Sequence, residues 1–209
     1  PNGCGKTTSI GMMLGLITPT QGEIFIDGIQ LNSENRIKLL SFMNFASPYI
    51  ELPKKLTVRQ NLEVYARLYG VKNKIERIDE LIEDLSLSKF LYKNTGELSS
   101  GQKNRVSLAK SLINKPKLLF LDEPTASLDP DVGDFVREYL ENYKNKNQLT
   151  MLLASHNMKE VERLCNKVIM MKQGKIVDNG TCQELIKKHG RENLEDTFLK
   201  IARSKNEFK

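Results

Sequence analysis

Apolar residues recur every three or four positions through the middle of the chain. This spacing predicts amphipathic helices from Val58 to Tyr69 and from Ile75 to Leu85. A third helix is predicted from Ser99 to about Asn114, and another follows the glycines at the start of the chain, from Thr7 to Ile17. The middle of the chain is therefore predicted to be mainly helical.

Two other segments are apolar at nearly every position. They are KLLFL, residues 117–121, and LTMLLA, residues 149–154. Runs of this kind are typical of strands buried on both faces, as in a parallel sheet. Shorter strands are predicted at residues 23–27 and 40–46, a hairpin at 168–171 and 176–177, a helix start at Asp129-Pro130, and a capping box at Thr181 and Glu184. We therefore expect an α/β core with a helical segment, residues 57–115, inserted within a single domain that covers residues 1–209.

Composition narrows the class of protein. The chain has 209 residues, of which 39% are hydrophobic, and this suits one globular domain with a core. Its net charge is +6, but the basic residues are spread along the chain, which argues against nucleic-acid binding. The cysteines Cys4, Cys165 and Cys182 lack metal-type spacing and fit a reducing compartment. No apolar run reaches the ~20 residues of a membrane helix, so we expect a soluble, cytosolic domain.

The first eight residues, PNGCGKTT, fit the second half of the phosphate-loop pattern G-x-x-x-x-G-K-[ST]. Gly3 and Gly5 allow a tight turn whose N–H groups point at phosphate oxygens, and the helix that follows adds its positive end. Lys6 would reach the β- and γ-phosphates, and the Thr7 hydroxyl would bind Mg²⁺. An ordinary glycine turn before a helix would remain the less favoured alternative if this segment stood alone.

An acidic pair makes the ordinary explanation improbable. In LLFLDEPTASLD, Asp122 ends a buried apolar strand and Glu123 follows it. A carboxylate at Asp122 can hold Mg²⁺, usually through water, and Glu123 can orient and deprotonate an attacking water. A strand-terminal acidic pair can also simply begin a turn, but the upstream GKT favours the catalytic interpretation.

Two further motifs could contact a ligand. LSSGQ, residues 98–102, predicts a helix start with capping serines, and a helix start with free N–H groups can bind phosphate. In ASHN, residues 154–157, His156 follows a buried strand, where the carboxyl edge of a sheet presents residues to a ligand. A lone histidine is more often an ordinary packed or solvent-facing residue.

In this order, GCGKTT, LSSGQ, LDEPTASLD and SHN resemble the ATP-binding subunit of an ABC transporter, and the resemblance covers essentially the whole chain. It implies a P-loop NTPase core of the ABC ATPase type, ATP and Mg²⁺ as cofactors, and a head-to-tail dimer. It implies that Glu123 is the catalytic carboxylate, that His156 holds the γ-phosphate and attacking water, and that Thr7 and Asp122 bind the metal. The nucleotide-binding residues would be Asn2, Gly3, Cys4, Gly5, Lys6, Thr7 and Thr8, with Ser99, Gly101 and Gln102 acting on the ATP of the opposite subunit.

The same resemblance implies partners and a location. They are membrane-spanning subunits on a separate chain and a second ATPase subunit, identical or different, at the cytoplasmic face of the cell membrane. The loop Ser127–Asp129 would cross the dimer interface. The tail NLEDTFLKIAR, residues 193–203, resembles ATPases of ABC-2-type export systems, which favours export, although it could simply be a packed amphipathic helix.

Three features depart from the family pattern. The first glycine of the phosphate loop would precede Pro1, together with a strand and an adenine-stacking aromatic, so we expect an N-terminally truncated sequence. Ser100 replaces the central glycine of the signature, which a serine can do if its backbone stays in the usual region. The family's coupling-loop glutamine is missing from the expected place, Ala46 to Pro48.

Other functions remain as alternatives. A non-transport ABC ATPase acting on the ribosome or on DNA usually carries two cassettes or long coiled-coil insertions, whereas this chain has one cassette and a short interval between GKT and LSSGQ. A P-loop kinase or GTPase would give LSSGQ and SHN no role. We therefore expect an ATPase that powers transport of a substrate the sequence does not identify.

Overall fold

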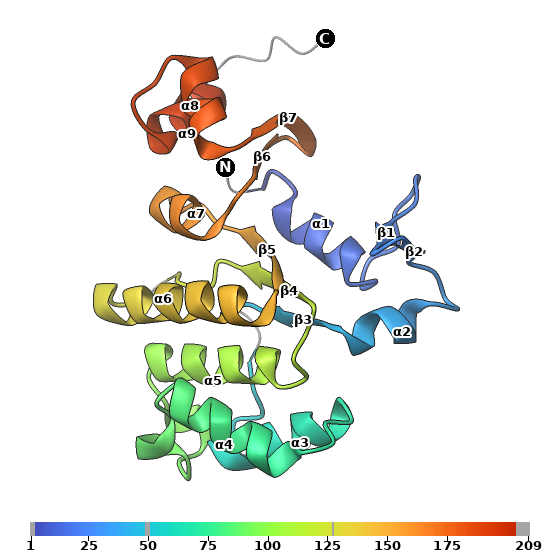
Figure 1. Ribbon diagram of the computed structural model, residues 1–209, viewed down its shortest axis with the longest axis vertical. Coiled ribbons are helices and arrows are strands. Elements are labelled where there is room, and N and C mark those ends of the chain that lie inside the picture. Colours follow the sequence, from blue (N-terminus) through green and yellow to red (C-terminus); the bar gives the residue numbers. More distant parts are fainter. Residues whose placement is uncertain (1–2, 49–50, 127, 204–209) are drawn as a thin grey trace. The chain divides into compact units, whose positions relative to one another are not determined.

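The computed structural model describes residues 3–48, 51–126 and 128–203. It divides into two compact units, one formed by residues 1–17 and 154–209 and the other by residues 18–153. Figure 1 shows the elements of both units. The prediction that residues 57–115 form a helical segment inserted within a single domain, residues 1–209, stays a prediction.

The first unit is built from segments at both ends of the sequence. It contains α1 (Lys6–Met13), α7 (Met158–Leu164), β6 (Val168–Lys172), β7 (Lys175–Gly180), α8 (Cys182–His189) and α9 (Leu194–Arg203). β6 and β7 form the predicted antiparallel hairpin. Its core is a cluster of four buried residues, Val161, Met170, Leu185 and Leu194.

The second unit contains a three-stranded sheet in the order β3-β4-β5, namely Met43–Ala46, Leu118–Asp122 and Thr150–Ala154, with β5 ending at the unit boundary. β3 and β4 are parallel, with Phe45 opposite Phe120. The middle strand β4 is buried along most of its length, as its uninterrupted apolar run predicts.

Helices make up most of the remainder of this unit. They are α2 (Arg36–Ser41), α3 (Val58–Leu68), α4 (Lys74–Asp84), α5 (Ser100–Leu112) and α6 (Pro130–Asn147), with 3₁₀ turns at Ser88–Phe90 and Thr95–Glu97 and a small hairpin of β1 (Phe25–Ile26) and β2 (Ile29–Gln30). The order of elements confirms the predicted α/β class. Figure 1 shows α5 running beside α6, with α3 and α4 beyond it.

Local sequence signals explain most of the helix boundaries. Thr57, Ser99 and Thr181 each cap a helix in a reciprocal capping box, so the box predicted at Thr181 and Glu184 is confirmed. Pro130 opens α6 at its first position, where a missing N–H costs nothing. The first helix is shorter than predicted because Gly15 adopts a left-handed backbone (φ 67°) just after it.

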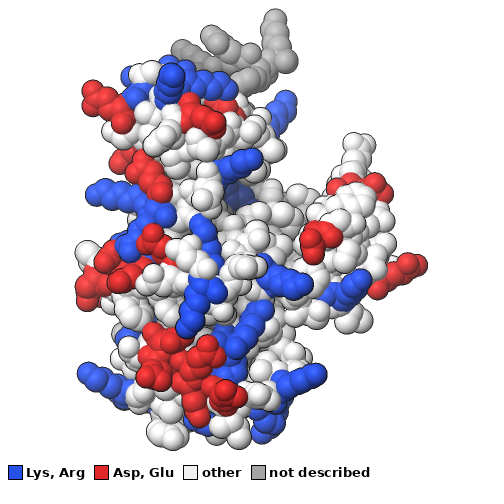
Figure 2. All heavy atoms as spheres, in the orientation of Figure 1, with Lys and Arg blue, Asp and Glu red and all other residues white. Residues whose placement is uncertain are grey.

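Charged side chains of both signs lie on the face shown in Figure 2, where acidic side chains gather in one cluster low in the view with basic side chains around it. In the part of the chain that the structure describes, no helix has both the length and the apolar character to cross a membrane.

Candidate functional site

The glycine loop lies in the first unit and leads directly into α1. Gly3 and Gly5 both have a left-handed backbone, with φ of 72° and 100°, which a residue with a Cβ adopts only with strain. Gly5 is the N-cap of α1 and provides no side-chain cap, so the first N–H groups of the helix are not covered by a capping side chain. This arrangement fits a bound phosphate, which would accept hydrogen bonds from those groups.

The loop is held against the turn of the β6–β7 hairpin. The Gly174 N–H donates to the Cys4 carbonyl at 3.0 Å, and a Cβ on Gly5 would lie 3.6 Å from the Gly174 Cα. Cys4 is buried, and the Lys6 ammonium lies 4.0 Å from its sulfur. The hairpin therefore supports the backbone of the glycine loop.

His156 belongs to the same unit and lies in a short turn between β5 and α7. The Ser155 hydroxyl donates to the Glu160 carboxylate at 2.7 Å and accepts a hydrogen bond from the Asn157 N–H at 3.0 Å. The Asn157 side chain in turn caps α7. His156 itself is exposed, so the turn presents it at the surface while its neighbours are fixed.

The acidic pair lies in the second unit, at the carboxyl end of β4. Asp122 is the last residue of that strand, and both it and Glu123 are buried. Glu123 has a left-handed backbone with φ of 53°, an unusual conformation for a residue with a side chain. The Ala126 N–H donates to the Glu123 carbonyl at 3.0 Å and closes a tight turn. This places two carboxyl groups where the sheet ends, as the sequence predicts.

The signature segment begins α5 in the same unit. The Ser99 hydroxyl accepts from the Gln102 N–H at 3.3 Å, and the Gln102 side-chain oxygen accepts from the Ser99 N–H at 3.1 Å. Ser100 is the first residue of the helix, and its φ is not positive. Its backbone therefore stays in the usual region, which is the condition under which a serine can replace the signature glycine. A Cβ on Gly101 would lie 3.2 Å from a methyl group of Val132, so α6 packs closely against this position.

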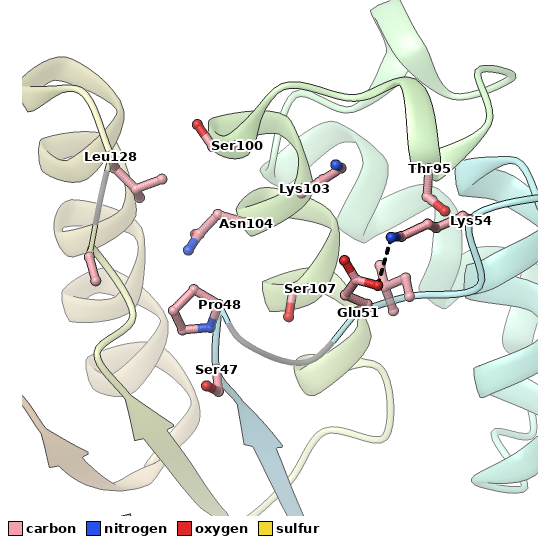
Figure 3. Close-up of a pocket in the computed structure, with 12 residues that line it drawn as sticks. Ser47, Pro48, Glu51, Lys54, Thr95, Ser100, Lys103, Asn104, Ser107 and Leu128 are labelled. Atoms are coloured by element: carbon pink, nitrogen blue, oxygen red, sulfur yellow. Dashed lines mark ion pairs between the residues drawn. The ribbon is translucent and has the colours of Figure 1, made fainter.

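The expected place of the coupling-loop glutamine follows β3. Ala46 ends that strand, Ser47 is buried, and Pro48 is exposed. Ser47 and Pro48 line a pocket of about 340 Å³ beside α5. Figure 3 shows Ser100, Lys103 and Asn104 on α5 around this pocket, and the ion pair of 2.8 Å between Lys54 and Glu51.

The predicted residues thus fall into two groups. The glycine loop and His156 are in the first unit, and the acidic pair and the signature are in the second. Asn2 and Ser127 lie outside the described residues. The assigned roles of all these residues remain proposals.

Two polar residues of α5, Lys110 and Asn104, make contacts that sequence reasoning missed. Lys110 is buried, and its ammonium donates to the Phe45 carbonyl at 3.4 Å and lies 5.3 Å from the centre of the Tyr65 ring. Burial lowers the pKa of Lys110. Asn104 donates to the Pro124 carbonyl at 2.6 Å. A polar residue on a predicted helix looks solvent-exposed in sequence, so only the fold reveals these contacts.

Comparison with known proteins identifies the family. Residues 1–126 match the family model described as ABC transporter. The chain belongs to the ABC transporter family. It carries the ATPase domain of that family, as the four motifs imply.

Relatives of known function share this domain. The ABC transporter ATP-binding protein NatA of Bacillus subtilis is 32% identical over 95% of this chain and 81% of its own length. The carnitine transport ATP-binding protein OpuCA of Listeria monocytogenes is 33% identical over 94% of this chain. This chain spans only about half of the length of OpuCA (50%).

Solved structures agree with the family assignment. One is described as the structure of the ATP binding subunit of an ABC transporter, with a TM-score of 0.86, 25% identity, and coverage of 96% of this chain and 85% of that one. Another is a dimeric post-hydrolysis state of an ATP-binding cassette bound to ADP and Pi, with a TM-score of 0.78, 25% identity, and coverage of 87% and 82%. The fold is therefore that of an ABC ATPase.

Proposed function

We propose that the protein binds and hydrolyses ATP to power transport of a substrate across a membrane through separate membrane subunits. The observation that carries the proposal is the acidic pair at the end of β4, in a chain of the ABC transporter family. The relatives NatA and OpuCA are both named as ATP-binding proteins of transport systems, which supports the same function here.

The nucleotide phosphates are assigned to the glycine loop. The left-handed Gly3 and Gly5 and the start of α1 supply N–H donors, and Lys6 supplies a positive charge. The hydroxyl of Thr7 and the carboxylate of Asp122 are the oxygen ligands that Mg²⁺ prefers, so they fit this metal. When bound, Mg²⁺ neutralises charge on the phosphates during their transfer.

Glu123 is assigned as the general base. Its carboxylate would orient an attacking water and accept its proton, and its burial keeps bulk water away from that carboxylate. His156 is assigned to the γ-phosphate and the attacking water, where an imidazole can donate a hydrogen bond. The fixed turn around His156 would hold it in place for that role.

The signature is assigned to the ATP held by a second ATPase subunit. Ser99, Gly101 and Gln102 stand at the start of α5, where helix N–H groups favour a phosphate. The Ser99 hydroxyl accepts a hydrogen bond within the capping box and keeps its own proton for donation. A dimeric ATP-binding cassette among the similar structures supports this pairing.

If the protein is coupled to membrane subunits as proposed, it would lie at the cytoplasmic face of the membrane. Export is the proposed direction, because residues 193–203, which contain α9, resemble the tail of ABC-2-type ATPases. Under this proposal the membrane subunits, and not this chain, select the transported substrate.

The proposal is tested with Glu123→Gln in the full-length protein. This change keeps the size of the side chain and removes its charge and its basicity, so turnover should fall by about 10²- to 10⁴-fold while Mg-ATP still binds. The variant should accumulate as a dimer at saturating ATP, measured by size-exclusion chromatography with light scattering. Unchanged turnover would exclude Glu123 as the base.

Ser99→Arg separates the signature from the nucleotide site. A bulky cation at the start of α5 should block the ATP-dependent dimer of Glu123→Gln and leave ATP binding to the monomer intact. In the otherwise unchanged protein, assembled with its membrane subunits, it should abolish ATP-driven transport in vesicles. Full turnover and transport by Ser99→Arg would contradict the assignment of the signature to a second subunit.

A further inference from the structure

One side chain connects the signature helix to the turn that carries the proposed base. Asn104 lies on α5, shortly after the signature residues, and its side-chain amide donates to the Pro124 carbonyl at 2.6 Å. Pro124 is the residue that directly follows Glu123. In Figure 3, Asn104 projects from α5 into the space between this helix and the segment that leads to α6.

The turn at Glu123 depends on its flanking contacts. Glu123 has φ of 53°, in the left-handed region that residues with a Cβ occupy only when the surroundings hold them there. The hydrogen bond from the Ala126 N–H closes the turn from within. Asn104 holds it from outside, because a buried carbonyl such as that of Pro124 needs a donor.

The direction of the Glu123 side chain follows from this backbone. Rotation of the peptide planes next to Glu123 swings its Cα–Cβ bond, and with it the carboxylate. The amide of Asn104 fixes the carbonyl one residue away, so its loss would free the turn without removing any group that touches ATP.

We propose that Asn104 is a positioning residue for ATP hydrolysis, which aims the Glu123 carboxylate by holding the Pro124 carbonyl. This inference rests on the proposed role of Glu123 as the general base. It gives α5 a second function besides presenting the signature: the same helix fixes the base of its own subunit.

The experiment compares Asn104→Asp, Asn104→Ala and Asn104→Gln in the full-length protein. Asp keeps the shape of the side chain but loses the donor when ionised, and Gln keeps the donor on a longer stem. Asp and Ala should lower kcat by about 10- to 100-fold, the scale of a slightly misplaced catalytic group, with KM for ATP within about threefold. Gln should recover part of kcat.

Asn114 provides a matched control. It is also an asparagine, just past the end of α5, and its amide donates to the carbonyls of Ser41 and Met43 at 3.2 and 3.3 Å. Asn114→Ala should lower the melting temperature about as much as Asn104→Ala and leave kcat unchanged. Equal losses of kcat in both variants would show that Asn104 acts only through stability.

A double-mutant cycle makes the test specific to Glu123. If Asn104 works through the base, Asn104→Ala should cost nothing further in the Glu123→Gln background, measured by single-turnover hydrolysis. A multiplicative loss, or a loss confined to KM, would overturn the positioning role. Unchanged turnover in Glu123→Gln alone would instead exclude Glu123 as the base, so a failure of that proposed role and a failure of the positioning role are distinguishable.

Discussion

The guanidinium of Arg77 on α4 donates a hydrogen bond of 2.9 Å to the hydroxyl of Tyr143 on α6. The same group donates to the Leu112 carbonyl at the end of α5 at 2.7 Å and pairs with Glu80 at 2.8 Å. Arg77 is only 3% exposed. One buried cation therefore joins three helices and fixes α4 and α5 to α6.

We expect Arg77→Met to lower the free energy of unfolding by about 2–3 kcal/mol. The loss leaves the Leu112 carbonyl and the Tyr143 hydroxyl without this donor in a buried place, and each such group costs about 1–3 kcal/mol. The methionine side chain fills the space of the aliphatic part of Arg77 and so offsets part of this cost. Urea unfolding followed by circular dichroism measures the change.

Two milder variants serve as controls for Arg77. Tyr143→Phe removes one hydrogen bond and should cost about 1 kcal/mol. Glu80→Gln removes a partner whose side chain is 42% exposed, so its cost should stay below about 1 kcal/mol. A loss of less than 1 kcal/mol for Arg77→Met would contradict the bridging role.

The contact of Arg77 illustrates what the sequence could not predict. Helices α3, α4, α5, α6 and α8 and the buried strand β4 follow from local signals, namely periodicity, capping residues and an uninterrupted apolar run. Helical periodicity places Tyr143 on the apolar face of its helix, but nothing local marks Arg77 as buried, and the two residues are 66 positions apart. Long-range polar contacts of this kind are decided by packing.

Short elements were missed for a related reason. Helices α2 and α7 have six and seven residues, too few to show a clear period, and α2 occupies the start of the strand predicted at residues 40–46. In the candidate site, the structural position of each motif was predictable because each lies at a local signal: a glycine turn, a strand end or a capping box. Asn104 carries no such signal, since its contact with Pro124 spans 20 residues.

We expect Gly101→Val to destabilise the protein by about 1–3 kcal/mol. Its Cβ would lie 3.2 Å from a methyl of Val132, and the branched atoms would add to the overlap in a packed region. Val132→Ala should restore most of the stability. Thermal unfolding of the single and double variants gives the coupling between the two positions.

Gly133→Ala is the matched control for the signature glycine. A Cβ at Gly133 would meet the flexible guanidinium of Arg137 at 3.3 Å, so the side chain can move away. This change should be neutral or slightly stabilising, because alanine favours a helix by about 1 kcal/mol over glycine. If Gly101→Val were equally harmless, α6 would not restrict the signature.

Alkylation of Cys4 should report on the phosphate loop. Cys4 is buried and its carbonyl is held by Gly174, whereas Cys165 and Cys182 are partly exposed. Iodoacetamide should therefore modify Cys4 more slowly than the other two, and Mg-ATP should slow it further by holding the loop. Mass spectrometry of the peptides measures all three rates in one sample. Equal rates at Cys4 with and without Mg-ATP would contradict phosphate binding by this loop.

The pH dependence of stability should contain a contribution from Asp178. This buried carboxylate of β7 accepts a hydrogen bond from the Lys188 ammonium, and Nε2 of His189 on α8 lies against its other oxygen, both at 2.7 Å. Burial alone would raise the pKa of Asp178, but the hydrogen bonds from Lys188 and His189 outweigh it and lower the pKa below its ordinary value.

The sign of the effect follows from this shift. Because the pKa of Asp178 is lower in the folded than in the unfolded protein, its stabilising contribution is fully present above about pH 4 and is lost as the pH falls through the folded-state pKa.

Asp178→Asn should cost at least about 1.5 kcal/mol at pH 7, the scale of hydrogen bonds to a charged group. Urea unfolding from pH 7 to pH 3 should show the two proteins converging at the acidic end. The exposed Glu195 is the control, since Glu195→Gln should stay within about 0.5 kcal/mol at every pH. A constant gap between Asp178→Asn and the unchanged protein down to pH 3 would show that the charge of Asp178 does not hold α8 against β7.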